Sequence, residues 1–342
     1  MSTTTLTNRA YRLRRRPVGA PVEGDLELVS EPVRELADGE ILVQTLYLSL
    51  DPTNRLWMSD MRQYSQPVEL GEVMRGIGIG QVVESRRRDV LAGSIVSGYT
   101  QWQEYCVADP DAGFFPLPDP LQAPLTAYLG VLGHTGLTAY VGLEMADVAV
   151  GDTVVVSAAG GAGGSVAGQI AKDRGAHVVG IAGGAEKCRH VVDDIGFDAC
   201  IDYTAPDWRS RFDAATQDGV DVDFENVGGE IMDHVMMRLN FRSRIILCGM
   251  ISQYDAAGSS WYGQINVGQI LMQRATMRGF IVSDHADEFP AGFAYLTDLY
   301  AKGRLKGDET IVEGFDQALA ALRRLFTGEK TGKLLVHVAD PT

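Results

Sequence analysis

The sequence contains few cysteines and histidines, and none of them stands at a spacing typical of a metal site. Its four cysteines form no Cys-x-x-Cys pair, and its six histidines form no His-x-x-x-His pair. Zinc sites in proteins are usually built from such closely spaced ligands. We therefore predict no metal centre. Because Cys188, Cys200 and Cys248 fall in or beside predicted core segments, we expect buried free thiols there.

Positive charge is also scarce. The chain has 30 lysines and arginines against 45 acidic residues, a formal net charge of −15. This balance argues against nucleic acids and anionic membranes as partners, and the one basic cluster, residues 12–16, is short. The sequence also lacks an apolar run of about 18 residues and an apolar signal segment at its start. We expect a cytoplasmic protein with no membrane partner.

The length and the local patterns predict two domains. A single core rarely extends much beyond ~250–300 residues, and this chain has 342. Residues 1–120 alternate short strand-like runs, such as 40–49 and 78–83, with turn residues, which indicates a β-rich, barrel-like domain. From about residue 125, helices alternate with strands, as in a parallel sheet. Further predicted elements are strands at 220–224, 244–248 and 333–338, a helix at 231–239, and a core-facing helix with the apolar stripe Phe315, Leu319, Leu322 and Phe326.

A glycine-rich turn lies between a buried strand at 153–156 and a helix at 165–172. Gly161 would allow the tight turn, Gly164 would let the backbone approach a phosphate, and Gly168 would permit close helix–sheet packing. The start of the helix would offer N–H groups to an anion. A second strand at 177–182 completes a β-α-β unit. The pattern predicts a dinucleotide site, although small residues would also suit a helix packed tightly on a sheet.

The end of the second strand has no acidic residue. NAD sites usually place Asp or Glu there to bind the ribose 2′-hydroxyl, whereas this chain has Gly183 and Gly184, followed by Lys187 and Arg189. Small residues and a nearby cation accommodate a 2′-phosphate. The sequence thus favours NADP(H). The alternative, that the two cations are solvated helix charges, stays open, chiefly for Arg189.

Several motifs, taken in order, resemble one known family. The chain resembles the zinc-free medium-chain dehydrogenase/reductase superfamily, and within it the prostaglandin reductase and alkenal double-bond reductase group, which includes curcumin-reductase-like enzymes. The resemblance covers nearly the whole length. Its motifs are residues 47–52, 136–140, 157–172, 180–188, 196–198, 202–203, 226–229, 248–254 and 279–284.

The resemblance implies an α/β fold with two domains. A Rossmann domain with a doubly wound parallel sheet, residues 126–309, would bind NADP(H). Residues 1–125 with 310–342 would form a β-rich, GroES-like substrate domain. The active site would lie in the interdomain cleft. Family members are usually homodimers that use NADPH to reduce the carbon–carbon double bond of α,β-unsaturated ketones or aldehydes.

The same resemblance extends to individual residues. Lys187 and Tyr203 would hold the 2′-phosphate, Asn226 would lie near the ribose and nicotinamide, and backbone around Phe280 and Val282 would line the nicotinamide pocket. The full set of implied cofactor contacts is Gly161, Ala162, Gly163, Gly164, Gly183, Lys187, Tyr203, Asn226, Cys248, Ile251, Phe280, Val282 and Lys330.

Tyr254 is the candidate catalytic residue, because it matches the family's Ile-Ser-x-Tyr tyrosine. Hydride addition to the β-carbon of an enone puts negative charge on the carbonyl oxygen, and a donor aimed at that oxygen stabilises it. A phenol can donate at neutral pH. A tyrosine packed on a surface loop is the alternative. Tyr47 and Tyr64 are weaker pocket candidates and fit structural roles better.

The chain departs from the family pattern at several places. Thr53 and Asn54 replace a common Tyr-Met pair, so an aromatic pocket contact is expected to be missing. Lys330 stands where relatives have an asparagine that approaches the nicotinamide amide. His134 and Thr135 replace a common Met-Pro pair. These changes leave the reaction class intact and put the identity of the substrate in doubt.

Two other functions remain open. The same fold supports zinc-free quinone oxidoreductases and carbonyl reductases, which would give a hydroquinone or an allylic alcohol as product. A non-catalytic NADPH-binding protein is the third hypothesis.

Overall fold

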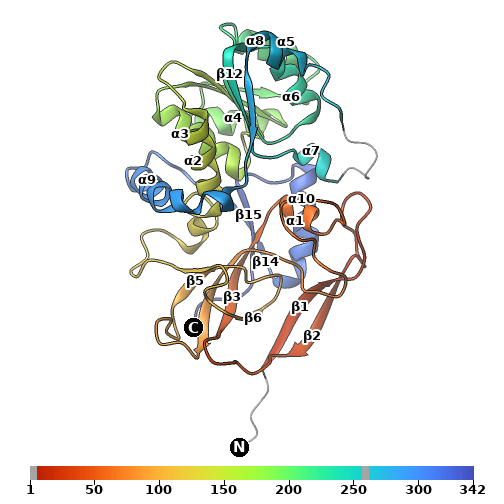
Figure 1. Cartoon of the computed structure of the whole chain (residues 1–342), viewed down its shortest axis with the longest axis vertical. Helices are drawn as coiled ribbons and strands as arrows, with labels where there is room; N and C mark the ends of the chain where they lie inside the picture. The colour runs from red at the N-terminus through yellow and green to blue at the C-terminus, as the bar shows by residue number, and fades with distance from the viewer. Residues whose placement is uncertain (1–5, 256–261) are drawn as a thin grey trace, which may run out of the picture. The chain divides into compact units, whose positions relative to one another are not determined.

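The computed structural model describes residues 6–255 and 262–342. They form two compact units (Figure 1). The β-rich unit comprises Met1–Leu129, Glu309–Glu329 and Lys333–Thr342, and the α/β unit comprises Gly130–Asp308 and Lys330–Gly332. Within these residues the α/β unit has one sheet, the β-rich unit has two, and each unit has its own apolar core.

The α/β unit is built on a parallel sheet with the strand order β10-β9-β8-β11-β12-β13. Val154, Val155 and Val156 are fully buried in the middle of it, as an uninterrupted apolar run predicts for a strand covered on both faces. The strands are β8 (Thr153–Ser157), β9 (His177–Ala182), β10 (Ala199–Asp202), β11 (Val220–Glu225), β12 (Leu239–Leu247) and β13 (Thr276–Gly279).

Helices cover both faces of this sheet. In Figure 1, α2 and α3 lie next to each other on one side, and α5, α6 and α8 lie on the other. The helices are α2 (His134–Ala146), α3 (Ala162–Asp173), α4 (Ala185–Asp193), α5 (Trp208–Ala215), α6 (Gly229–Met236), α7 (Ile251–Tyr254), α8 (Gly268–Gln273) and α9 (Phe289–Ala301), with the 3₁₀ helix η2 at Val282–Glu288.

Several element boundaries differ from the prediction, and two of the differences have a clear physical reason. The α3 helix begins at Ala162 rather than at residue 165, because Gly161 takes an extended N-cap conformation and the following glycines are helical. The predicted helix at 231–239 ends at Met236, and Leu239 instead begins β12. The reason is tertiary: Leu239 is paired with Val220 of β11. Sheet pairing prevails there over the apolar helical periodicity.

The β-rich unit has a larger sheet with the order β14-β15-β3-β4-β5-β7, and β6 also pairs with β3. The antiparallel pair β1 and β2 forms a separate sheet. The strands are β1 (Thr7–Leu13), β2 (Leu26–Pro32), β3 (Ile41–Leu50), β4 (Gly78–Ser85), β5 (Ile95–Gly98), β6 (Tyr105–Ala108), β7 (Phe114–Pro116), β14 (Glu309–Glu313) and β15 (Lys333–His337). The helices are α1 (Thr53–Trp57), η1 (Leu125–Tyr128), η3 (Phe315–Gln317) and α10 (Ala318–Thr327).

The chain's last strand returns to this unit, as predicted, because β15 pairs antiparallel with β3. The predicted apolar stripe is also confirmed: Phe315, Leu319 and Leu322 are buried in the core of the β-rich unit, and Phe326 packs against it. Among the residues that the structure describes, no helix is both long and apolar enough to cross a bilayer.

Candidate active site

The carboxyl ends of the parallel strands share one edge of the α/β sheet, and the strand order reverses between β8 and β11. Ligands of doubly wound proteins bind at such a reversal. The cofactor contacts that the resemblance implies between residues 161 and 282 all lie just after the carboxyl end of a strand of this sheet. Gly161 to Gly164 follow β8, Gly183 and Lys187 follow β9, Tyr203 follows β10, Asn226 follows β11, Cys248, Ile251 and Tyr254 follow β12, and Phe280 and Val282 follow β13.

The glycine turn after β8 has two kinds of glycine. A Cβ added at Gly164 would lie 2.4 Å from Ala158 O, and one at Gly168 would lie 1.8 Å from Phe197 Cζ. Packing within the chain therefore explains both of these glycines. At Gly163 the nearest atom to an added Cβ is Thr135 Cγ2, at 3.9 Å, so packing does not explain it. A diphosphate brought against the backbone at the start of α3 does explain it, and the turn fits a dinucleotide.

Lys187, which follows β9, lies against the glycine turn, and Tyr203, which follows β10, lies against Gly183 at the end of β9. The stem of Lys187 lies across Gly160, because a Cβ added there would be 2.5 Å from Lys187 Cγ. The ring of Tyr203 lies 3.1 Å from the position of an added Cβ at Gly183. Burial lowers the pKa of the Lys187 ammonium from its ordinary value. The two residues that the resemblance assigns to the 2′-phosphate thus each lie against a glycine at the carboxyl edge of the sheet.

An aspartate that the sequence analysis did not single out orders this region. Asp202 Oδ1 accepts hydrogen bonds from Gly184 N at 2.8 Å and from Thr204 N at 3.0 Å. These bonds fasten the end of β10 to the turn that follows β9. Because the Asp202 carboxylate accepts from two backbone N–H groups, we interpret Asp202 as a residue that fixes the local backbone.

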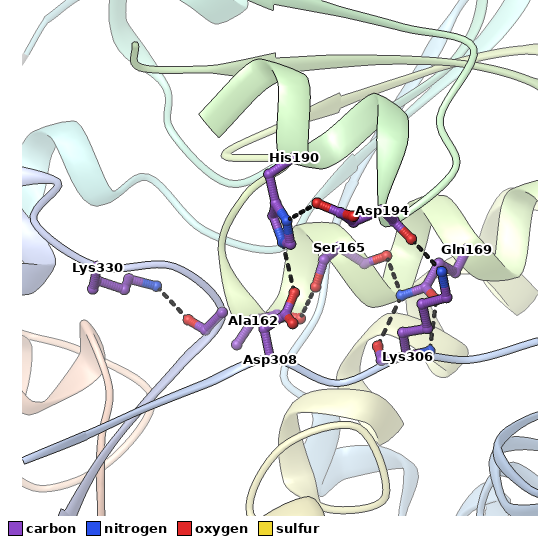
Figure 2. Close-up of polar contacts among 9 residues, drawn as sticks. Ala162, Ser165, Gln169, His190, Asp194, Lys306, Asp308 and Lys330 are labelled. Atoms are coloured by element: carbon purple, nitrogen blue, oxygen red, sulfur yellow. Dashed lines mark hydrogen bonds and ion pairs between the residues drawn. The ribbon is translucent and has the colours of Figure 1, made fainter. Parts of the chain in front are cut away.

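Lys330 lies at the start of α3. Its ammonium donates to Gly332 O at 2.9 Å and lies 3.6 Å from the position of an added Cβ at Gly161 (Figure 2). Gly332 N in turn donates to Gly160 O at 3.0 Å. The segment 330–332 is therefore bonded to the glycine turn. It brings a positive charge to the place where a diphosphate would sit.

A buried network occupies the point where the strand order reverses. Ser157 Oγ donates to Glu225 Oε1 at 2.9 Å and accepts from Asn226 N at 2.7 Å. Asn226 Nδ2 donates to Ser157 O at 2.7 Å. The Glu225 carboxylate also accepts from Val227 N and from Gly228 N. The network fixes the orientation of Asn226.

Neither Ser157 nor Glu225 was a candidate from the sequence. Both are fully buried. Burial raises the pKa of Glu225, against hydrogen bonds that lower it, and the neighbouring Asp223 has a pKa raised by burial and by the Glu225 charge. The sequence did carry one signal for Glu225, because an acidic residue ends an apolar strand immediately before Asn226.

The segment after β12 is tied to the Asn226 loop. Ile251 N donates to Asn226 O at 3.0 Å, and Cys248 N donates to Glu225 O at 2.9 Å. Burial raises the pKa of Cys248 to about 12, so its thiol is neutral at physiological pH. Cys248 and Ile251 therefore act here through backbone and packing.

Tyr254, the last residue of α7, is half-buried beside this loop. Its Oη accepts from Met250 N at 3.0 Å. A Cβ added at Gly249 would lie 3.3 Å from Tyr254 Oη and 3.3 Å from Asn226 O. The phenol therefore lies over Gly249 next to Asn226, at the carboxyl edge of the sheet. This differs from a tyrosine packed on a surface loop.

Phe280 and Val282 follow β13. Val282 is buried, and a Cβ added at Gly142 of α2 would lie 3.0 Å from Phe280 Cζ. Both side chains pack into the unit, so a contact from this segment to a ligand would come from backbone.

In the β-rich unit, the residues that depart from the family pattern have local partners. Asn54 is buried, accepts from Asp51 N at 2.8 Å and donates to Arg75 O at 3.2 Å, so it fixes the start of α1. Thr53 Oγ1 and Tyr64 Oη are hydrogen-bonded. An aromatic side chain thus stands beside Thr53, and the missing aromatic pocket contact stays a prediction. Tyr47 packs on His337, with ring centroids 5.0 Å apart.

No group of three or more His, Cys, Asp or Glu side chains within residues 6–255 and 262–342 is arranged to hold a metal ion. None of the four cysteines is in a disulfide.

A Rossmann sheet with a dinucleotide turn, together with a GroES-like β-rich unit, defines the medium-chain dehydrogenase/reductase fold. Two family models match the chain: "N-terminal domain of oxidoreductase" at residues 9–116, and "Zinc-binding dehydrogenase" at residues 163–298. The chain belongs to this superfamily, and within it to the zinc-free prostaglandin and alkenal reductase group, which confirms the resemblance seen in the sequence.

Individual relatives match nearly the whole chain. The NADPH-dependent curcumin reductase of Escherichia coli is 38% identical over 338 residues, covering 97% of each chain. Mouse prostaglandin reductase 1 is 35% identical, covering 96% of this chain and 98% of its own. The crystal structure of CurA in complex with NADPH from Vibrio vulnificus matches with a TM-score of 0.92 and 39% identity, covering 97% of this chain and 100% of that chain.

Proposed function

We propose that this chain reduces the carbon–carbon double bond of α,β-unsaturated ketones or aldehydes with NADPH. It is an NADP-dependent oxidoreductase, and its cofactor is NADP(H). The observation that carries the proposal is the position of Tyr254. Its phenol lies over Gly249, next to Asn226 and at the sheet edge that carries the glycine turn.

The α/β unit is the proposed cofactor domain, and the β-rich unit the proposed substrate domain. Backbone N–H groups of Ala162, Gly163 and Gly164 would bind the diphosphate, with Lys330 adding a positive charge. Lys187 and Tyr203 would bind the 2′-phosphate, the lysine through a charge-assisted hydrogen bond. When bound, NADPH supplies a hydride to the β-carbon of the substrate. The protein's own side chains must position the substrate and stabilise the negative charge on its carbonyl oxygen.

Tyr254 is the proposed donor to the substrate's carbonyl oxygen. Negative charge develops on that oxygen as the β-carbon is reduced, and a fixed donor there stabilises the transition state by about 3–4 kcal/mol. The bond from Met250 N to Tyr254 Oη strengthens the phenol as a donor, because consecutive hydrogen bonds polarise one another. The phenol keeps its proton, and its hydrogen bond stabilises the enolate formed, which takes a proton from water at the α-carbon to give the saturated carbonyl product.

Asn226 is the proposed contact to the ribose next to the nicotinamide. Its amide nitrogen donates to Ser157 O, so we assign its amide oxygen to a ribose hydroxyl. Ser157 and Glu225 are positioning residues for it. Backbone at Phe280 and Val282 is the proposed edge of the nicotinamide pocket.

The test is consumption of NADPH and of NADH with a panel of linear enals, cyclic enones, aryl enones and quinones, with products identified by mass and NMR. Saturated carbonyl products with a strong NADPH preference support the proposal. Turnover of quinones alone, or allylic alcohols as products, would show a different two-electron reduction. Tight NADPH binding without turnover across the panel would show a non-catalytic protein.

A cytoplasmic location stays a prediction of the sequence, which cell fractionation tests.

We also propose that the protein is a homodimer through the outer edge of the α/β sheet. β13 ends the strand order, and large apolar side chains near it are exposed, with Ile265 at 77% and Leu271 at 74%. A second copy would cover them. Light scattering is expected to give a dimer, and Leu271→Asp a monomer. The matched change Leu91→Asp, at an exposed leucine of the β-rich unit, should leave the dimer intact; a wild-type monomer would contradict the proposal.

A further inference from the structure

Two cysteines meet beside the proposed 2′-phosphate pocket. Cys188 lies in α4 and Cys200 in β10, and the Cys200 thiol donates to Cys188 Sγ with the sulfurs 2.8 Å apart. A disulfide bond is about 2.0 Å long, so the sulfurs need to approach only slightly to bond. Cys188 is buried and Cys200 is partly exposed. The sequence predicted buried thiols at both positions and did not bring them together.

The two thiols differ in reactivity. The hydrogen bond from Cys200, and weaker attraction to Lys187, lower the pKa of Cys188 against the effect of burial, whereas the pKa of Cys200 is raised by the same bond and by burial. Cys188 also lies near the positive end of α4, which favours a thiolate. Cys188 is therefore the nucleophile of the pair, and Cys200 is the second thiol within reach.

We propose that Cys188 and Cys200 are a modification site, at which a hydroperoxide converts the two thiols to a disulfide and thereby weakens NADPH binding. The Cys188 thiolate attacks one peroxide oxygen, the O–O bond breaks, and the departing oxygen takes up a proton. The resulting sulfenic acid is attacked by Cys200 sulfur; the S–O bond breaks and water leaves with the Cys200 proton. Two thiols lose two electrons, and hydrogen peroxide becomes two waters.

The coupling to the cofactor follows from the neighbours of each cysteine, and it rests on the proposed 2′-phosphate site. Lys187, whose stem lies across Gly160, directly precedes Cys188. Cys200 stands in the same short strand as Asp202, which holds Gly184 N, and Tyr203 follows it. A disulfide would therefore join the two segments that bind the 2′-phosphate.

The second half of α4 is bonded to the segment 306–308, because His190 contacts Asp308 and Lys306 Nζ donates to Asp194 O at 2.6 Å. His190 lies between two aspartates, with Nδ1 2.7 Å from Asp194 and Nε2 2.7 Å from Asp308 (Figure 2). When the sulfurs approach, the displacement falls on the first turn of α4. That turn carries Lys187. We therefore expect the ammonium to lose its alignment with the phosphate.

The experiment treats the full chain with hydrogen peroxide and compares it with chain kept in dithiothreitol. Mass spectrometry after alkylation of remaining thiols should find a peptide pair linked through Cys188 and Cys200, removed by dithiothreitol. Calorimetry should find NADPH bound about tenfold more weakly, the effect of weakening one charge-assisted hydrogen bond. NADH binding should change little, because it has no 2′-phosphate.

Cys200→Ser should form no linked pair and keep its NADPH affinity after peroxide; Cys200→Ala is the second variant. Cys106→Ser, at a buried cysteine of β6, is the matched control and should respond like the wild type. A wild type without the linked pair, or with the pair and an unchanged ratio of NADPH to NADH affinity, overturns the proposal. A reduced protein that binds NADPH no better than NADH would instead refute the 2′-phosphate site itself.

Discussion

The phenol oxygen of Tyr254 accepts a 3.0 Å hydrogen bond from the backbone N–H of Met250, four residues before it. The bond closes the short helix α7 and holds the ring over Gly249. The phenol is thus fixed before any ligand binds. A preorganised donor of this kind requires no reorganisation during the reaction.

Tyr254→Phe should lower kcat by about 10²–10³-fold, the usual cost of removing one donor to a developing oxyanion. The NADPH dissociation constant should stay nearly constant, because the ring remains. Steady-state kinetics and cofactor titration measure the two quantities. An unchanged kcat would mean that another group serves the carbonyl oxygen.

Lys187→Ala should raise the KM for NADPH by about 10–100-fold, since it removes a charge-assisted hydrogen bond to the 2′-phosphate. The KM for NADH should change little. Arg189→Ala is the matched control, because Arg189 is an exposed cation of the same helix. Equal increases of the KM for NADPH and for NADH would show that Lys187 does not bind the 2′-phosphate.

Gly163→Ala and Gly168→Ala should have opposite consequences. At Gly163 an added Cβ meets nothing closer than 3.9 Å, so the melting temperature should hold while NADPH binding weakens. At Gly168 the Cβ would overlap the Phe197 ring, so the melting temperature should fall, with a cost of about 1–3 kcal/mol for overpacking. Thermal unfolding and NADPH titration of both variants test this. If Gly163→Ala bound NADPH normally, the diphosphate site would lie elsewhere.

Ser157→Ala should reduce kcat/KM by roughly tenfold, because it removes the hydroxyl that accepts from Asn226 N and donates to Glu225, although the backbone oxygen that accepts from the Asn226 side chain remains. Ser243→Ala is the matched control: this serine of β12 is also buried, and its hydroxyl has no hydrogen-bond partner among the described residues. It should keep near wild-type kinetics. Similar losses of kcat/KM in both variants would show that the Ser157 effect comes from general packing and not from its hydrogen bonds.

Stability should fall as the pH rises from about 4, because the pKa values of Asp223 and Glu225 are raised in the folded chain by burial. The folded state then holds more protons than the unfolded state, so the stabilisation is complete below the unfolded pKa values and is lost as pH rises through the folded ones. Urea unfolding at about pH 5 and about pH 8 measures it. Asp223→Asn, which cannot titrate, should show a shallower decline; a wild type that gains stability toward pH 8 would show the opposite linkage.

The elements that the sequence predicts well are those whose signal is local. The strand β9 has the bounds His177–Ala182 that its apolar run predicts. The start of α3 was placed three residues late, since consecutive glycines have low helix propensity and only the N-cap geometry at Gly161 fixes the boundary. The helix expected to reach Leu239 ended earlier, because pairing with Val220 is invisible to local periodicity.

The site follows the same rule. Gly164, Lys187 and Tyr254 stand in contiguous motifs and could be proposed from the chain alone. The bond between Ser157 and Glu225 joins residues 68 positions apart, so only the fold brings them together. The resemblance implies Lys330 as a cofactor contact, but its position next to Gly161 is a property of the folded chain. Residues that support a site through such distant contacts have no spacing to reveal them.

The bond from Gly332 N to Gly160 O gives the glycine turn a reporter far away in sequence. The proton of that amide can exchange with solvent deuterium only when the bond opens, so its exchange rate records how often the turn loosens. A dinucleotide that binds only when this bond is closed makes opening rarer and therefore slows the exchange. The factor of slowing reports the free energy with which the dinucleotide stabilises the closed turn. Cofactor occupancy can therefore be read from a peptide that ends the nucleotide-binding unit, without following any reaction.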